Sequence, residues 1–256
     1  MKKVVFIGII LLGVLVASCN PEDNGTEPLP VETATLKLHL HTYIGEEEVE
    51  LYNAVYRNTS NRKISLSISQ LYISEVALVK YDGSLYYVGD SIILTDIINQ
   101  VYSLGKVPVG NYKSIRFNVG LSPVLNARVP SGAGILNNAD MWFSPTAQAN
   151  NYVFMKCVGK IDTTLAATAA DIDMVPFQYV IGTNARLTQV SMPVQNYAVQ
   201  PNATTFIHMK ADYAELFDGI DLLDETNLTV ATSADNITSI AIDVAANISK
   251  MFKYEN

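Results

Sequence analysis

The residues of this chain best suited to chemistry are its three histidines, two of which are nearly adjacent. His39 and His41 lie in the segment TLKLHLHTY, and His208 lies in the segment TTFIHMKA. Because alternate side chains of an extended strand point to opposite faces, His39 and His41 share one face, with roughly 7 Å between their Cβ atoms. Neutral imidazoles are preferred ligands of copper and zinc. The spacing therefore makes His39 and His41 candidate metal ligands.

Two further residues are candidates to complete such a site. His208 joins the pair only if its strand lies beside theirs, and the soft thioether of Met141 would favour copper over zinc. A simpler interpretation treats His39 and His41 as solvent-facing strand residues, with His208 hydrogen-bonded at a sheet edge. Spacing alone favours this simpler interpretation.

The histidine-bearing segment has the alternation of a strand that covers a core, because Leu36, Leu38 and Leu40 share the opposite face. An apolar content of 49% with 16% charged residues supports a packed core. Turns are expected at residues 82–83 and 107–111. Further strands are expected at Lys63–Ser69, Leu71–Lys80, Leu85–Val88, Ile92–Leu94, Tyr112–Gly120, Tyr152–Gly159, Phe177–Ile181, Arg186–Met192 and Thr204–Ala211. Short strands separated by turns predict an all-β fold, an antiparallel β-sandwich of the immunoglobulin-like or Greek-key type.

Two segments depart from the strand pattern. Apolar residues recur at three- and four-residue spacing near the C-terminus, which predicts a C-terminal α-helix over residues 238–252, capped by Asp235 or Asn236. Residues 123–145 form a long irregular segment that contains Trp142, the only tryptophan. Long loops in compact domains often carry function.

The N-terminus has the layout of an exported lipoprotein. Two lysines precede an apolar run that ends in VASC, which predicts a signal peptide over residues 1–18. The VASC sequence resembles a bacterial lipobox, which implies cleavage before Cys19 and attachment of diacylglycerol to its sulfur. Residues 19–33 are rich in Pro, Glu and Asn and are expected to form a tether, which leaves residues 34–256 as a single domain.

The acidic residues Glu22 and Asp23 follow the lipidated position. They resemble the surface-export signals of lipoproteins in the Bacteroidetes. We therefore expect a protein of the outer membrane that is lipid-anchored and faces either the periplasm or the cell surface.

Charge and motif content argue against other functional classes. A net charge of −8 without a basic run repels phosphate backbones, so nucleic acid is not an expected partner. The sequence contains no nucleophile elbow, phosphate loop, dinucleotide fingerprint or HExxH motif, so an enzyme is not expected. With Cys19 lipidated, Cys157 has no disulfide partner within the chain and is expected to be a small buried hydrophobe.

The order of several motifs resembles that of the MbnP-like family over most of the mature chain. The motifs are LYISEVAL at 71–78, YDG at 81–83, VPVGNYKSIRFNVGL at 107–121, MWF at 141–143, YVF at 152–154, FQYVIG at 177–182, DYAELF at 212–217 and NISKMF at 247–252. Single pieces such as P-x-G-x-Y are common in exported β proteins, and their order is the specific feature. The resemblance implies a periplasmic or lipid-anchored copper-binding β-sandwich, associated with methanobactin and copper-handling operons.

The resemblance also implies particular site residues. The family's metal site uses histidines, with a nearby tryptophan that a dihaem, peroxidase-like partner enzyme oxidises to kynurenine. His39 and His41 fall in the first strand, and Trp142 matches the tryptophan region. Members often read F-x-Y-H-I-G where this chain reads FQYVIG, so Val180 replaces one family histidine. His208 is the candidate to compensate for that loss.

These observations predict an exported, lipid-anchored protein that binds a metal ion for acquisition or buffering rather than catalysis. Copper is the expected metal. The expected ligands are His39, His41 and His208. Met141 and Trp142 are expected to line the site, and Trp142 is also the candidate for oxidative modification. The alternative is a surface interaction module that binds a glycan, peptide or protein partner through residues 123–145 without metal. Exposed aromatic side chains in that segment would favour this alternative.

Overall fold

The computed structural model describes residues 31–89 and 92–255. The predicted signal peptide, Cys19 and the tether up to residue 30 lie outside the described residues. The described residues from 32 onward group into one compact unit. Within the described part of the chain, no helix has the length and apolar character needed to cross a membrane.

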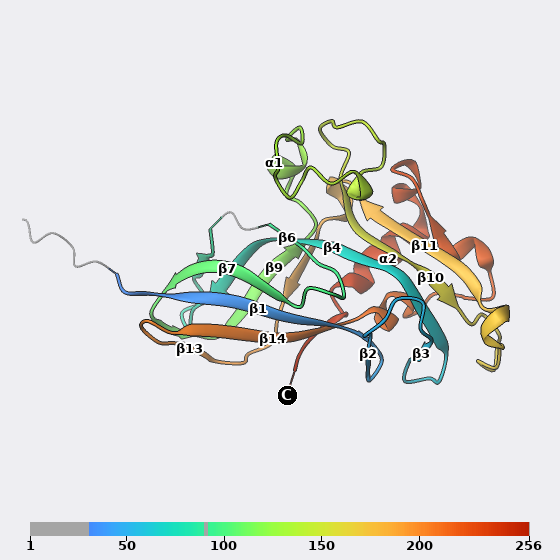
Figure 1. Ribbon diagram of the computed structural model, residues 1–256, viewed down its shortest axis with the longest axis horizontal. Coiled ribbons are helices and arrows are strands. Elements are labelled where there is room, and N and C mark those ends of the chain that lie inside the picture. The colour runs from blue at the N-terminus through green and yellow to red at the C-terminus, as the bar shows by residue number, and fades with distance from the viewer. Residues whose placement is uncertain (1–30, 90–91, 256) are drawn as a thin grey trace, which may run out of the picture. The chain divides into compact units, whose positions relative to one another are not determined.

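The first sheet is built around β1 (Thr33–Ile44), the strand that carries His39 and His41. The other strands of this sheet are β2 (Glu47–Glu48), β7 (Val101–Pro108), β14 (Thr204–Asp212) and β16 (Phe252–Tyr254). Their order is β16-β14-β1-β2, and β7 also pairs with β1. β14 runs parallel to β1, whereas β7 is antiparallel to it. Figure 1 shows β1 and β14 side by side.

The second sheet is built around β4 (Lys63–Val79), a strand of 17 residues. The remaining strands are β3 (Tyr56–Arg57), β5 (Leu85–Tyr87), β6 (Ile93–Leu94), β8 (Gly110–Tyr112), β9 (Ser114–Val119), β10 (Val153–Ile161), β11 (Val175–Gly182), β12 (Thr188–Ser191), β13 (Tyr197–Val199) and β15 (Thr229–Val230). The order is β12-β9-β4-β10-β11-β15, and β3, β5 and β6 also pair with β4. β8 and β13 form a separate two-stranded ribbon.

The main hydrophobic core lies between the two sheets. Leu36 and Leu38 from β1 share one buried cluster with Ile207 from β14 and Leu66 from β4. Burial of a leucine or isoleucine side chain contributes roughly 2 kcal/mol. The predicted all-β sandwich with a C-terminal helix is confirmed. Two strand pairs, β1 with β14 and β11 with β15, are parallel, so the sheets are mixed rather than antiparallel throughout.

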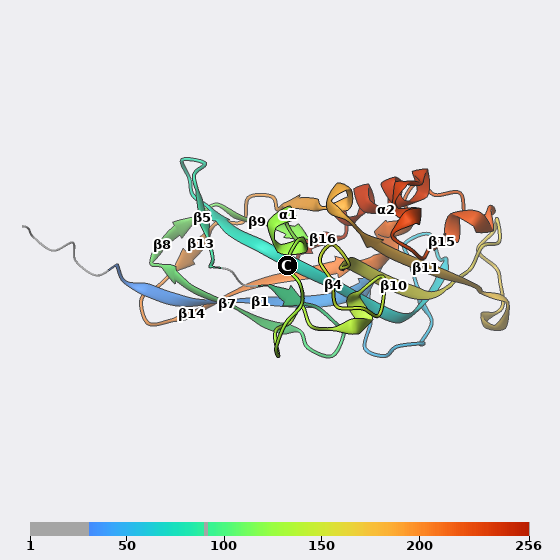
Figure 2. The same cartoon turned by 90° about the horizontal axis from the view of Figure 1, so that it is seen from above.

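The C-terminal helix α2 spans Ser239–Ile248 and packs against β11 and β12 (Figure 2). Its cap is Thr238, whose hydroxyl accepts a hydrogen bond from a backbone N–H of the first turn, and not the expected Asp235 or Asn236. The helix ends before residue 252, because the last described residues turn back and pair with β14 as strand β16.

The predicted strands differ from the structure in two main respects, and the short strands β2, β3, β13 and β15 were also not predicted. The strands expected at 63–69 and 71–80 are one continuous strand, β4, whose register with β9 shifts between Ser74 and Ala77 at a β-bulge. The sequence analysis missed β7 and assigned its last residues to a turn. β7 ends at Pro108, which has no backbone N–H, and β7 pairs with β1 alone, as an edge strand does.

A second, smaller apolar cluster involves the segment 123–145. This segment contains the short helix α1 (Pro123–Asn126) and a single 3-10 turn, Ala139–Met141, and is otherwise irregular, as expected. The buried members of the cluster are Tyr72, Leu121, Met141, Tyr152, Val153, Phe154 and Val180. Trp142 packs against this cluster and not against the main core.

The close crossing of β10 and β4 predicts the effect of one substitution. A Cβ at Gly159 would collide with the backbone oxygen of Ser65, which cannot move without disrupting the sheet. We expect Gly159→Ala to destabilise the protein by about 2 kcal/mol, measured by thermal unfolding. Gly134→Ala is the control. The Cβ added there would lie 3.6 Å from the backbone oxygen of Ser131, which is an ordinary van der Waals contact. Equal melting temperatures for the two variants would contradict this packing.

Candidate metal centre

The parallel register of β1 and β14 brings the third histidine beside the first. His39 is paired with His208, and the preceding pair is Leu38 with Ile207. Leu38 and Ile207 fill the core, so strand alternation places both imidazoles on the opposite, outer face of the sheet. The pattern that buries the apolar residues therefore also fixes the positions of the histidines.

The three imidazoles form a chain of close nitrogen contacts. Nδ1 of His39 lies 3.0 Å from Nδ1 of His208, and Nε2 of His39 lies 2.7 Å from Nε2 of His41. At the far end, Nδ1 of His41 lies 3.1 Å from Oε1 of Glu48 and 3.4 Å from Oε1 of Glu255. The chain of contacts therefore runs from exposed His208 to Glu48, and Glu255 lies close both to His41 and to the other two histidines.

The carboxylates favour one arrangement of protons on the ring nitrogens. Two anionic oxygens beside Nδ1 of His41 favour a proton there, which leaves Nε2 of His41 as a hydrogen-bond acceptor. Nε2 of His39 then donates to it, so Nδ1 of His39 is unprotonated and its lone pair faces Nδ1 of His208. This tautomer is the one that a metal ligand needs.

His39, His208 and Glu255 form a group that fits a metal ion. Each offers one ligand atom, and these atoms all lie within 4.8 Å of one another. Metal–ligand bonds of about 2.0–2.2 Å place neighbouring ligand atoms about 3 Å apart, which agrees with the separation of the two Nδ1 atoms. Across residues 31–89 and 92–255, no second group of three His, Cys, Asp or Glu residues meets this criterion.

His41 contacts His39 but does not belong to the group that could hold the metal ion. Its Nε2 contacts the nitrogen of His39 that faces away from His208, so His41 orients His39 as hydrogen-bonded partners of metal ligands do. Nδ1 of His41 is buried and makes no aligned hydrogen bond. The nearest oxygen, Oε1 of Glu48, also accepts a hydrogen bond of 2.7 Å from the amide of Gln100. Gln100 therefore helps to hold the carboxylate that faces His41.

The environment keeps His39 in the form that binds metals. Burial lowers the pKa of His39 below the ordinary value of 6.5, and the neighbouring His41 and His208 lower this pKa further. Glu255 and Glu48 raise the pKa of His39, but by less. His39 is therefore neutral at physiological pH, as metal binding requires.

Two cation–π contacts flank the histidines on the same open face. Nζ of Lys37 lies 5.8 Å from the ring centroid of Phe206, and Nζ of Lys210 lies 5.0 Å from the ring centroid of Tyr43. Lys37 and Phe206 are register partners two residues before His39 and His208. Lys210 is the register partner of His41 and reaches diagonally to Tyr43. Each contact contributes roughly 0.5–1 kcal/mol.

Met141 and Trp142 do not join the histidines. Met141 is fully buried in the second cluster, and the half-buried Trp142 packs against it. The indole Nε1 of Trp142 donates a hydrogen bond of 3.0 Å to the carbonyl of Leu136. Among the described residues, no contact links Met141 or Trp142 to a histidine. The geometry therefore gives the histidine site no thioether ligand.

Val180, where the resemblance implies a histidine, lies in the same cluster as Met141. Its side chain is buried, and its carbonyl accepts a hydrogen bond of 3.0 Å from the amide of Asn236. The surroundings of Trp142 are therefore apolar at the position where the family would place an imidazole. The three histidines of this chain gather elsewhere, on the outer face of the first sheet.

The sequence analysis missed Glu255, Glu48 and Gln100. Glu255 follows β16, and its backbone N–H donates to the carbonyl of His208 at 3.2 Å. No spacing in the sequence relates this C-terminal glutamate to the first strand, because the relation depends on the pairing of β16 with β14. Cys157, by contrast, is buried in the main core as expected, and burial raises the pKa of its thiol.

Comparison with known proteins identifies what this chain is similar to. The sequence profile of the MbnP family matches residues 33–237. A solved structure, MbnP from Methylosinus trichosporium, matches with 14% sequence identity and a TM-score of 0.47, over 75% of this chain and 80% of that chain. No curated protein sequence matches.

The lowered pKa of His39 predicts how the metal-free protein responds to pH. The unfolded chain binds the proton of this histidine more readily than the folded protein does, so the contribution of His39 to stability is complete above pH 6.5. This contribution is lost as the pH falls from 6.5 toward the folded-state pKa. An NMR titration of the His39 imidazole should give a midpoint below 6.5, and His41→Ala should raise it. A midpoint at or above 6.5 would contradict this electrostatic account.

Proposed function

The chain belongs to the MbnP family, whose profile covers residues 33–237, and on that premise we propose that it is an exported, lipid-anchored copper-binding protein. The proposed ligands are His39, His208 and Glu255. The observation that carries the proposal is the 3.0 Å separation of the two Nδ1 atoms within a group that Glu255 completes. Acquisition or buffering of copper, rather than catalysis, is the proposed role.

The donor atoms favour Cu²⁺ over other ions. Sites made of imidazole nitrogen and carboxylate oxygen bind Cu²⁺ more tightly than Zn²⁺ or the earlier first-row divalent ions. The softer Cu⁺ prefers sulfur ligands. Met209 points into the core from β14, and Met141 is buried in the second cluster. Neither thioether is available, so we propose that the bound ion is Cu²⁺.

Each residue has a separate part in binding. His208 is the exposed end of the chain of imidazoles, which gives an ion access from solvent. His41 and Glu48 keep His39 in the tautomer whose Nδ1 is free. A site with few ligands on an open sheet face also allows the ion to leave, as buffering requires. Attachment to the outer membrane through Cys19 is supported by the lipobox-like VASC sequence.

The rival function, an interaction module at residues 123–145, has less support. It predicts exposed aromatic contact residues in this segment. Trp142 and Phe143 are instead half-buried and pack against the second cluster.

Copper titration of single-residue variants tests the proposal. The wild-type protein should bind one equivalent of Cu²⁺ in competition with a chelator. His39→Ala and His208→Ala remove a ligand and should weaken binding more than His41→Ala. The loss of His41, an orienting residue, should cost roughly 10- to 100-fold.

Lys37→Gln is the matched control, because Lys37 lies on the same face of β1 as His39 and offers no ligand to the group. This variant should retain wild-type affinity. The proposal is wrong if His39→Ala and His208→Ala both bind Cu²⁺ as tightly as the control variant does.

A further inference from the structure

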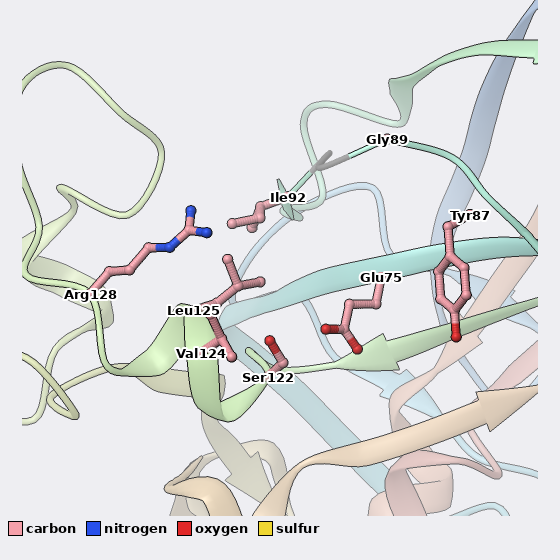
Figure 3. Close-up of a pocket in the computed structure, with 8 residues that line it drawn as sticks. All are labelled: Glu75, Tyr87, Gly89, Ile92, Ser122, Val124, Leu125 and Arg128. Carbon is pink, nitrogen blue, oxygen red and sulfur yellow. The ribbon is translucent and has the colours of Figure 1, made fainter.

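A pocket of about 450 Å³ opens at the second sheet, and none of the histidines lines it (Figure 3). It lies between the bulged part of β4, the end of β5, the residues Gly89 and Ile92, and the short helix α1. The lining residues are Glu75, Tyr87, Gly89, Ile92, Ser122, Val124, Leu125 and Arg128. Among the described lining residues, one side chain is acidic, one is basic, and Ile92, Val124 and Leu125 add an apolar surface.

Glu75 is held in place at the edge of this pocket. It lies in the β-bulge of β4, with a φ of 51°, a conformation that residues other than Gly, Asn and Asp rarely adopt. Its carboxylate accepts a hydrogen bond of 2.7 Å from the amide of Asn118 on β9. The bulge therefore turns an acidic side chain outward from a strand that is otherwise mostly buried, and Asn118 orients it.

Arg128 provides the opposite charge. In Figure 3 its guanidinium and the carboxylate of Glu75 point toward the pocket from opposite sides, with Leu125 between them in this view. Neither charged group forms an ion pair with any described residue. Both groups are exposed, so their charges remain available to a ligand.

The space between the charges is mostly apolar. Ile92 and Leu125 are half-buried there, and Val124 is 71% exposed. The hydroxyl of Ser122 makes no helix-capping hydrogen bond and also faces the pocket. A ligand that matches this lining has a cation at one end, an anion at the other and an aliphatic part between them.

We propose that this pocket binds a small zwitterion of the ω-aminocarboxylate type. The ammonium group binds the carboxylate of Glu75, the carboxylate group binds the guanidinium of Arg128, and the methylene chain lies on Leu125 and Val124. Arginine suits the anionic end because its planar guanidinium donates two parallel hydrogen bonds to a carboxylate. The proposal is independent of copper binding, because the two sites share no residue.

The test uses NMR titration of the protein with ω-aminocarboxylates of increasing chain length. One chain length should fit best and give saturable shifts of the backbone signals of Ser122 and Leu125, with roughly millimolar affinity. Glu75→Gln and Arg128→Gln should each weaken binding roughly two- to fivefold. Glu75→Gln keeps an oxygen that accepts from Asn118, so the bulge should stay folded. Asp243→Asn and Lys80→Gln are the charge-matched controls, and both should bind as the wild-type protein does.

Two further measurements separate a zwitterion site from a site for a single charge. A dicarboxylate and a diamine of the best-fitting length should each bind more weakly than the aminocarboxylate. The variant with exchanged charges, Glu75→Arg and Arg128→Glu together, should bind more tightly than either of these substitutions alone and approach the wild-type affinity, because the ligand can reverse its direction. The proposal is overturned if no chain length gives saturable shifts at the pocket. It is also overturned if the dicarboxylate or the diamine binds as tightly, or if the single variants bind as the controls do.

Discussion

The parallel pairing of β1 with β14 is the contact on which the histidine site depends. It places His39 opposite His208 while it buries Leu38 and Ile207 on the other face. The core and the site therefore share one register. A slip by one residue would expose the leucines and separate the imidazoles, so the hydrophobic effect that stabilises the sandwich also enforces the geometry of the metal centre. The site needs no loop of its own, because rigid strands position its histidines.

The charges near the histidines favour the tautomer and the charge state that His39 needs to bind a metal ion. The carboxylates of Glu48 and Glu255 lie at one end of the imidazole chain, and they favour the tautomer that frees Nδ1 of His39. Burial and the neighbouring rings lower the pKa of His39, so the ring stays neutral. The tryptophan region differs in kind, since Val180 and Met141 make it an apolar cluster. Within one family fold, this chain therefore concentrates its imidazoles on the outer face of the first sheet and leaves the tryptophan in apolar surroundings.

The sequence predicted the features that follow from local patterns. Alternation along β1 correctly placed the leucines inside and the histidines outside, because a strand side chain is either in or out. The sequence could not show that His208 lies beside His39. Their strands are far apart in the chain, and no local sequence pattern indicates that two such strands pair in parallel. Glu255 was missed for the same reason. The helical spacing near the C-terminus was real, but it could not show that residue 252 would leave the helix to pair with β14.

The most direct test of this account is pulsed EPR of the protein loaded with one equivalent of Cu²⁺. The account predicts hyperfine coupling from the nitrogens of two imidazoles, reduced to one in either His39→Ala or His208→Ala and unchanged in Lys37→Gln. A Cu²⁺ signal without imidazole coupling, or one that neither histidine variant alters, would contradict the claim that β1 and β14 together build a copper site.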